Sequence, residues 1–228
     1  MRQAFGDAPQ ASRDNRTATL LGVKVPRTVF PALLFSALLA LLLACPSASA
    51  SSLASARTAA PTHPVSAYLS AVGHVHQTYN NCGPASIVSV LSYYGIQVGQ
   101  GEVAGVLRPN GGYMLAGVIP PFVERYGLKA TRFRNGSLEN LRQLAAAGIP
   151  VIVLQWMNRP GGIPHFRVVR GYDDKAGLMW LSDPVYGPNV YVSYADFQRL
   201  WGLAGQEFVP VYRPAQTAQV GRILNVRL

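Results

Sequence analysis

The chain has 228 residues, of which 49% are hydrophobic and 13% are charged, so it can bury one sizeable core and carry an N-terminal extension. Its formal net charge is +10, and several of the basic residues lie before residue 28. The remaining arginines are scattered, with no basic run and no nucleic-acid-binding motif. This pattern excludes nucleic acid as an expected partner and favours attraction to an anionic envelope surface.

Residues 1–50 are expected to form a secretory signal peptide. An apolar run from Phe30 to Ala44 follows basic residues and precedes Ala48-Ser49-Ala50, a small-residue cleavage pattern. The run is shorter than the ~20 apolar residues of a typical membrane span and contains Pro31, so a permanent anchor is disfavoured.

Cys45 offers a second route of processing, because Leu42-Leu43-Ala44-Cys45 resembles a bacterial lipobox. A lipidated Cys45 would attach the protein to a membrane. On either route the protein is expected to be exported, as a periplasmic, secreted or membrane-anchored lipoprotein. Both routes leave Cys82, the other cysteine, without an intramolecular disulfide partner in an oxidising compartment, which favours a chemical role for its thiol.

Residues 51–67 are rich in Ala, Ser, Thr and Pro and predict a flexible linker. One folded domain is expected over residues 68–213, followed by a C-terminal tail at 214–228. Apolar spacing, caps and breakers predict that the first half of this domain is mainly helical. The expected helices are 83–94, 102–107, 114–126 with a break at Pro120-Pro121, and 137–147 with Ser137 as N-cap.

The second half of the domain has short apolar segments between Gly, Pro, Asn and Asp turns, which predicts an antiparallel sheet. The expected strands are 151–156, 166–172, 178–182, 190–192 and 207–212. One helix, 193–201, interrupts them after a capping-box pattern from Ser193 to Asp196. The predicted fold class is therefore α+β, with a helical N-terminal half and a sheet in the C-terminal half.

Cys82 opens the first predicted helix. At a helix N-terminus, unpaired amides and the positive end of the dipole favour a thiolate and lower the pKa of a thiol below its usual ~8.5. Downstream of it the chain has a single histidine, His165. A catalyst that pairs a cysteine with a histidine from this part of the chain must therefore use His165.

Four motifs in this order resemble the papain-like cysteine peptidases that process double-glycine leaders, and in particular a stand-alone secreted member of that family. They are Gln77 ahead of Asn81-Cys82-Gly83-Pro84-Ala85, the segment Gly148-Ile149-Pro150-Val151-Ile152-Val153, the segment Pro164-His165-Phe166-Arg167-Val168-Val169-Arg170-Gly171-Tyr172, and Leu181-Ser182-Asp183-Pro184. The resemblance spans residues 75–212 and implies a papain-like fold and a cysteine peptidase that acts on a peptide or protein substrate. The exporters in this family carry a transmembrane bundle and a nucleotide-binding segment, which this sequence lacks, so a leader-peptide substrate is not implied.

The resemblance also implies a role for four residues, and acyl-transfer chemistry agrees with each role. Cys82 is expected to attack the carbonyl carbon as a thiolate, and His165 to hold the partner proton and deliver it to the leaving amine. Asp183 is expected to orient the imidazole, and Gln77 to donate its side-chain amide to the oxyanion beside the backbone N–H of Cys82. A narrow cleft of this kind is expected to select small residues before the scissile bond.

Some competing assignments remain open from the sequence. Asp173 and Asp174 are alternative orienters of His165, although they are expected at the far end of a hairpin. His74 and His76 could ligate a metal together with Cys82, but no metal-binding motif is present, and neither a metal nor another cofactor is expected.

Two rival functions also fit the residues. The same triad could transfer an acyl group from an envelope amide to another acceptor, or the domain could be a catalytically idle module that binds peptides. Nothing in the sequence predicts an oligomeric state.

Overall fold

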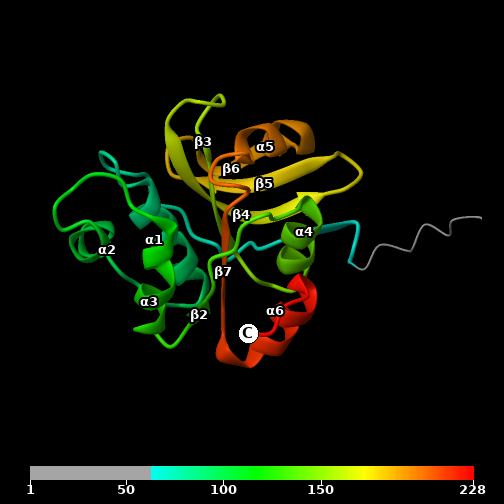
Figure 1. Ribbon diagram of the computed structural model, residues 1–228, viewed down its shortest axis with the longest axis horizontal. Helices are drawn as coiled ribbons and strands as arrows, with labels where there is room; N and C mark the ends of the chain where they lie inside the picture. The colour runs from blue at the N-terminus through cyan, green and yellow to red at the C-terminus, as the bar shows by residue number, and fades with distance from the viewer. Residues whose placement is uncertain (1–62) are drawn as a thin grey trace, which may run out of the picture. The chain divides into compact units, whose positions relative to one another are not determined.

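The computed structural model describes residues 63–228, which form a seven-stranded antiparallel sheet with helices packed on it (Figure 1). The strands are β1 (Ser66–Tyr68), β2 (Lys129–Ala130), β3 (Val151–Trp156), β4 (Pro164–Asp173), β5 (Leu178–Asp183), β6 (Gly187–Ser193) and β7 (Phe208–Tyr212). They follow the order β2-β7-β3-β4-β5-β6, and β1 pairs with the end of β4. Because β4 pairs with β1, β3 and β5, it is the strand around which the sheet is organised.

The helices form two groups. On one side of the sheet lie α1 (Cys82–Tyr93), α2 (Gln100–Leu107), a short 3-10 helix (Ala116–Val118) and α3 (Ile119–Glu124) (Figure 1). On the other side lie α4 (Leu138–Ala146) and α6 (Thr217–Leu224). α5 (Tyr194–Trp201) packs against β3, β5 and β6.

Alternation along the strands divides the buried side chains into two cores. In β3, Ile152 belongs to the core beneath α1, whereas Val151 and Val153 belong to the core beneath α4 and α5. In β4, Val168 belongs to the core beneath α1 and Val169 to the core beneath α4 and α5. Successive side chains of a strand point to opposite faces, so a run of apolar residues buried on both faces is what a sheet covered by helices requires.

Local capping fixes the starts of two helices where the sequence predicts them. The Ser137 hydroxyl accepts a hydrogen bond from the Asn140 amide (3.1 Å), and the Asn140 side chain accepts one from the Ser137 amide (3.1 Å). At α5, the Ser193 hydroxyl accepts from the Asp196 amide (3.1 Å). Each cap satisfies a donor that has no partner within its own helix.

The predicted fold class is confirmed, while the packed domain extends beyond both expected boundaries. β1 lies largely in the segment predicted as linker. The prediction of a C-terminal tail is wrong in part, because Pro214–Gln216 forms a 3-10 helix, α6 follows it, and Val220 is fully buried. The predicted signal peptide at residues 1–50, which includes Cys45, and residues 51–62 lie outside the described residues. Within residues 63–228, no helix is long and apolar enough to cross a membrane.

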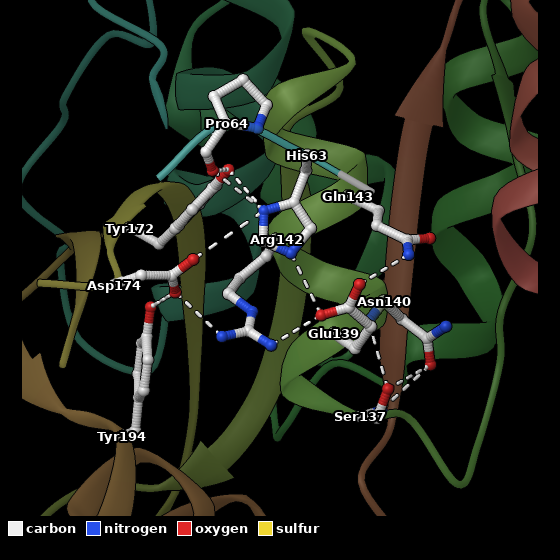
Figure 2. A network of polar contacts seen from close by, with 10 residues as sticks. All are labelled: His63, Pro64, Ser137, Glu139, Asn140, Arg142, Gln143, Tyr172, Asp174 and Tyr194. Carbon is white, nitrogen blue, oxygen red and sulfur yellow. Dashed lines mark hydrogen bonds and ion pairs between the residues drawn. The ribbon is translucent and has the colours of Figure 1, made fainter. Parts of the chain in front are cut away.

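A polar network fastens the first described residue to the domain (Figure 2). The buried His63 ring contacts Glu139 (3.1 Å) and the Tyr172 hydroxyl (3.0 Å), and Arg142 binds Glu139 (2.6 Å) and Asp174 (2.8 Å). Burial alone would raise the pKa of Glu139, but hydrogen bonds from His63, Gln143 and Arg142 outweigh it and lower that pKa to about 2. Asp174 is therefore bound in this network and not to His165. The network joins the chain before β1 to α4 and to the β4–β5 turn.

Candidate active site

A tight turn sets the start of α1. The Asn81 amide donates to the Thr78 carbonyl (3.0 Å), and Asn80 adopts a left-handed conformation (φ 57°) that asparagine tolerates better than most residues. The Asn81 carbonyl then accepts the first bond of the helix, from Ala85 (2.9 Å). Cys82 is the first residue of α1, so its thiol lies among amides that lack a partner within the helix.

The loop that precedes α3 is packed against this helix start. A Cβ atom at position 83 would lie 2.5 Å from Cε of Met114, so any residue other than glycine would require this methionine side chain to move. Arg108 donates to the Asn80 carbonyl (2.6 Å) and also binds the Gly112 carbonyl. These contacts hold Tyr113 at the cleft beside Cys82.

β4 and β5 bring His165 and Asp183 together. Both side chains are fully buried, and Nε2 of His165 lies 2.9 Å from Oδ1 of Asp183. The same Oδ1 accepts hydrogen bonds from the amides of Val185 (2.8 Å) and Tyr186 (3.1 Å). Asp183 is thus both an orienter of the imidazole and the residue that opens the turn after β5.

The hydrogen bond from Nε2 leaves Nδ1 as the ring nitrogen available to Cys82. Nδ1 is buried, and among residues 63–228 no nitrogen or oxygen atom forms a hydrogen bond with it. Burial would raise the pKa of the Cys82 thiol, but hydrogen bonds from His165 and the Phe166 amide outweigh it, and the pKa is lowered.

The pKa of the His165 imidazole shifts in the opposite direction to that of the Cys82 thiol. Burial would lower the pKa of His165, but its hydrogen bonds with Asp183 and Cys82 outweigh burial, and the pKa is raised. Burial likewise opposes ionisation of Asp183, whose pKa is nevertheless lowered by the hydrogen bond and charge of His165 and by the charge of Arg167. The arrangement therefore favours a thiolate beside an imidazolium.

Gln77 lies in the same cleft, on the loop before α1. Its backbone N–H donates to the carbonyl of Pro184 (2.9 Å), which connects this loop to the turn that follows Asp183. Its side-chain Oε1 is buried and has no hydrogen-bond partner among the described residues. The cleft, of about 510 Å³, thus contains Gln77, Cys82 and His165, and its other lining side chains include Tyr79, Tyr113, Met157, Ile163 and Val185.

The competing residues lie elsewhere or make other contacts. Asp173 accepts from the Ala176 amide (3.0 Å) in the β4–β5 turn, and Asp174 belongs to the His63 network. His74 contacts the Ser182 hydroxyl (3.1 Å) and packs edge to face on His76, which lines the cleft. Within residues 63–228, no group of three or more His, Cys, Asp or Glu side chains could hold a metal ion.

One residue of the site has no predicted role. Arg167, two residues after His165 on β4, is buried and donates from Nε to Oδ2 of Asp183 (2.6 Å). An arginine within an apolar strand is a signal that could have been used, because a buried guanidinium needs hydrogen-bond acceptors to compensate for lost water. The sequence does not say which residues supply them.

A cysteine at a helix start, beside an imidazole carried by an antiparallel sheet, is the arrangement of papain-like cysteine peptidases. Residues 69–209 match the Peptidase_C39 like family, and this match covers more than half of the chain, so the protein belongs to that family. It is therefore a cysteine-type peptidase, a hydrolase, and the resemblance drawn from the motifs is confirmed. No curated protein sequence matches the chain at a significant level.

Solved structures share the fold. A protein from Bacillus anthracis described as a C39-like peptidase is 21% identical, with a TM-score of 0.54, over 65% of this chain and 98% of its own. The peptidase domain of Streptococcus ComA is 19% identical, with a TM-score of 0.53, over 62% and 98%. A double-glycine motif protease from an AMS/PCAT transporter, solved in complex with the leader peptide, is 23% identical, with a TM-score of 0.50, over 62% and 91%.

The electrostatics of the cleft predict how Cys82 reacts. Alkylation by iodoacetamide should titrate with a midpoint below the ~8.5 of a free cysteine, because His165 lowers the pKa of the thiol. In His165→Ala this midpoint should rise. Rates of alkylation across a pH series, followed by intact-protein mass spectrometry, measure both. A midpoint of about 8.5 that is unchanged in His165→Ala would contradict the pairing of a Cys82 thiolate with a His165 imidazolium.

Proposed function

We propose that the protein is an exported peptidase that hydrolyses peptide bonds through Cys82, His165 and Asp183, with Gln77 as an oxyanion donor. The observation that supports it most is the contact of His165 with Asp183 (2.9 Å) at the wall of a cleft that also holds Cys82. Membership of the peptidase family gives the reaction class, and the geometry supports the proposed roles.

In the first step the Cys82 thiolate attacks the carbonyl carbon of the scissile bond, and the carbonyl oxygen takes the negative charge. His165, as imidazolium, gives its proton to the departing amine when the C–N bond breaks, which leaves a thioester on Cys82. The neutral imidazole then removes a proton from water as the water attacks the thioester. The C–S bond breaks, the carboxylic acid product leaves, and the site returns to a Cys82 thiolate beside a His165 imidazolium that holds the proton taken from water.

Asp183 serves the imidazole throughout this cycle. Its hydrogen bond to Nε2 fixes the ring so that Nδ1 faces the nucleophile, and its charge stabilises the imidazolium. In a buried site this charge is screened little by solvent, so its effect on His165 is large.

The oxyanion is stabilised by donors at the helix start. The backbone N–H of Cys82 precedes the hydrogen-bonded part of α1, and Gln77 lies in the same cleft. A donor of this kind contributes about 3 kcal/mol to transition-state stability in comparable sites.

Large side chains around the nucleophile support a preference for small residues before the scissile bond. Tyr113, Met157 and Ile163 line the cleft together with Cys82, and Met157 is tied to Ile163 by a backbone hydrogen bond (2.8 Å). A bulky substrate residue would have to displace these side chains. A solved neighbour with a similar fold is bound to a leader peptide, which supports a peptide as the substrate.

The division of roles predicts a pattern of activities. Cys82→Ala and His165→Ala should each abolish hydrolysis without unfolding the domain, and the double variant should be no slower than either single one. Gln77→Ala should lower kcat by about a hundredfold and KM little, because its amide acts in the transition state. Peptide cleavage followed by mass spectrometry measures these rates. Products that retain an acyl group on an added amine would instead identify acyl transfer.

The shape of the cleft predicts substrate selection. Peptides with Gly or Ala before the cut should be cleaved about tenfold to a hundredfold faster than peptides with Phe or Leu there, because overpacking costs about 1 to 3 kcal/mol. A peptide library measures the ratio of kcat/KM values. Efficient cleavage after Phe or Leu and none after Gly would refute this selection but leave the mechanism intact.

Export predicts a shortened chain in the cell. Protein recovered from its native host should begin near Ser51 or at a lipidated Cys45, because the sequence upstream has the pattern of a signal peptide. N-terminal mass spectrometry distinguishes these two forms. A population that mostly retains Met1 would contradict export.

A further inference from the structure

Arg167 makes a set of contacts that the proposed mechanism does not use. Its residue is only 4% exposed, and it lies two positions after His165 on β4, so both side chains point to the same face of the strand. Its Nε donates to Oδ2 of Asp183 (2.6 Å), whereas His165 binds the other oxygen, Oδ1 (2.9 Å). The two oxygens of the carboxylate are therefore held by different partners.

The rest of the guanidinium is bound as well. Nη1 donates to Oε1 of Gln155 (3.1 Å) and to the Trp156 carbonyl (3.1 Å), and Nη2 donates to the Met157 carbonyl (2.6 Å). Gln155 is itself buried, and its Nε2 donates to the Phe197 carbonyl (3.0 Å) in α5. The guanidinium thus connects Asp183 to the end of β3, and α5 holds the Gln155 side chain in place through the hydrogen bond to Phe197.

A carboxylate that is fully buried needs compensation for the loss of water. Asp183 receives four hydrogen bonds, of which the one from Arg167 comes from a permanently charged group. His74, in the loop before α1, also faces this region through its contact with Ser182 (3.1 Å), but it makes no hydrogen bond to Asp183 in the described structure. Arg167 is therefore the strongest support of the carboxylate besides His165.

We propose that Arg167 is a positioning residue of this site, which holds Asp183 ionised with Oδ1 toward His165. The proposal rests on the proposed function, because positioning matters only if Asp183 orients a catalytic imidazole. The planar fork is essential to it: a single ammonium cannot bind a carboxylate oxygen, a side-chain amide and two carbonyls in this fixed geometry.

Arg170 provides a matched control on the same strand. It is equally buried at 4% exposed, and it donates to the carbonyls of Pro188 (2.7 Å), Ser70 (3.1 Å) and Leu69 (3.3 Å). It makes no hydrogen bond to Cys82, His165 or Asp183 in the described structure. Replacing Arg170 removes a buried arginine from β4 without touching the triad.

The test compares Arg167→Lys and Arg167→Met with Arg170→Lys and Arg170→Met. The folded fraction of each variant is measured by circular dichroism, so that loss of folded protein does not appear as loss of rate. Both Arg167 variants should lower kcat per folded molecule by about tenfold to a hundredfold, the loss that a misplacement of about 1 Å causes. KM should change by less than about threefold, and the Arg170 variants should keep the wild-type kcat.

A double-mutant cycle with Asp183→Asn supplies the second readout. If Arg167 acts through Asp183, the variant Arg167→Met/Asp183→Asn should be about as active as the slower single variant. Multiplicative losses, an unchanged kcat in Arg167→Lys, or an equal loss in the Arg170 variants would overturn the proposal. If wild-type protein showed no hydrolysis that depends on Cys82, the proposed function itself would fail, which is a separate result. If Arg167→Met does not fold, Arg167→Lys carries the same cycle.

Discussion

The site depends on a fully buried negative charge at Asp183. A carboxylate in this position is stable only because four donors surround it, two from side chains on β4 and two from the amides of the turn after β5. The same bonds give the charge a direction, since Oδ1 faces the His165 ring and Oδ2 faces Arg167. Stability of the ends of β4 and β5 and orientation of the imidazole are therefore one requirement, and a change that relaxes either should disturb both.

The cleft lies where the start of α1 and the loop before it meet the sheet. α1 brings Cys82 from the core beneath it, while β4 and β5 bring His165 and Asp183 from the sheet. The hydrogen bond from Gln77 to the Pro184 carbonyl and the contact of His74 with Ser182 connect the loop before α1 to β5 and its turn. These short, directional bonds fix the position of Cys82 relative to His165, in addition to the apolar core that α1 shares with β3 and β4.

Much of this arrangement could be predicted from the sequence, because it is encoded locally. The helix that starts at Cys82 and the capped helices after Ser137 and Ser193 follow from patterns within a few residues, and the four motif residues identify one site. The pairing of β1 with β4 could not be predicted, since it depends on a distant partner and β1 has only three residues. α6 could have been predicted as a helix from the spacing of Val220, Ile223 and Leu224, but the sequence does not say what this apolar face packs against. The pairing of Arg167 with Asp183 could not be predicted either, because the two residues are 16 positions apart and meet only across paired strands.

The protonation state of His165 tests this account most directly. Nitrogen-15 NMR of the labelled ring reports whether both nitrogens carry a proton, and Cys82→Ala removes the thiolate that the imidazolium is paired with. The account predicts a doubly protonated ring in the wild-type protein near neutral pH, and a ring in Cys82→Ala that loses its proton at lower pH, because the Cys82 interaction contributes to the raised pKa of His165. A neutral ring in the wild-type protein from about pH 5 to pH 8, with the same titration in Cys82→Ala, would contradict it.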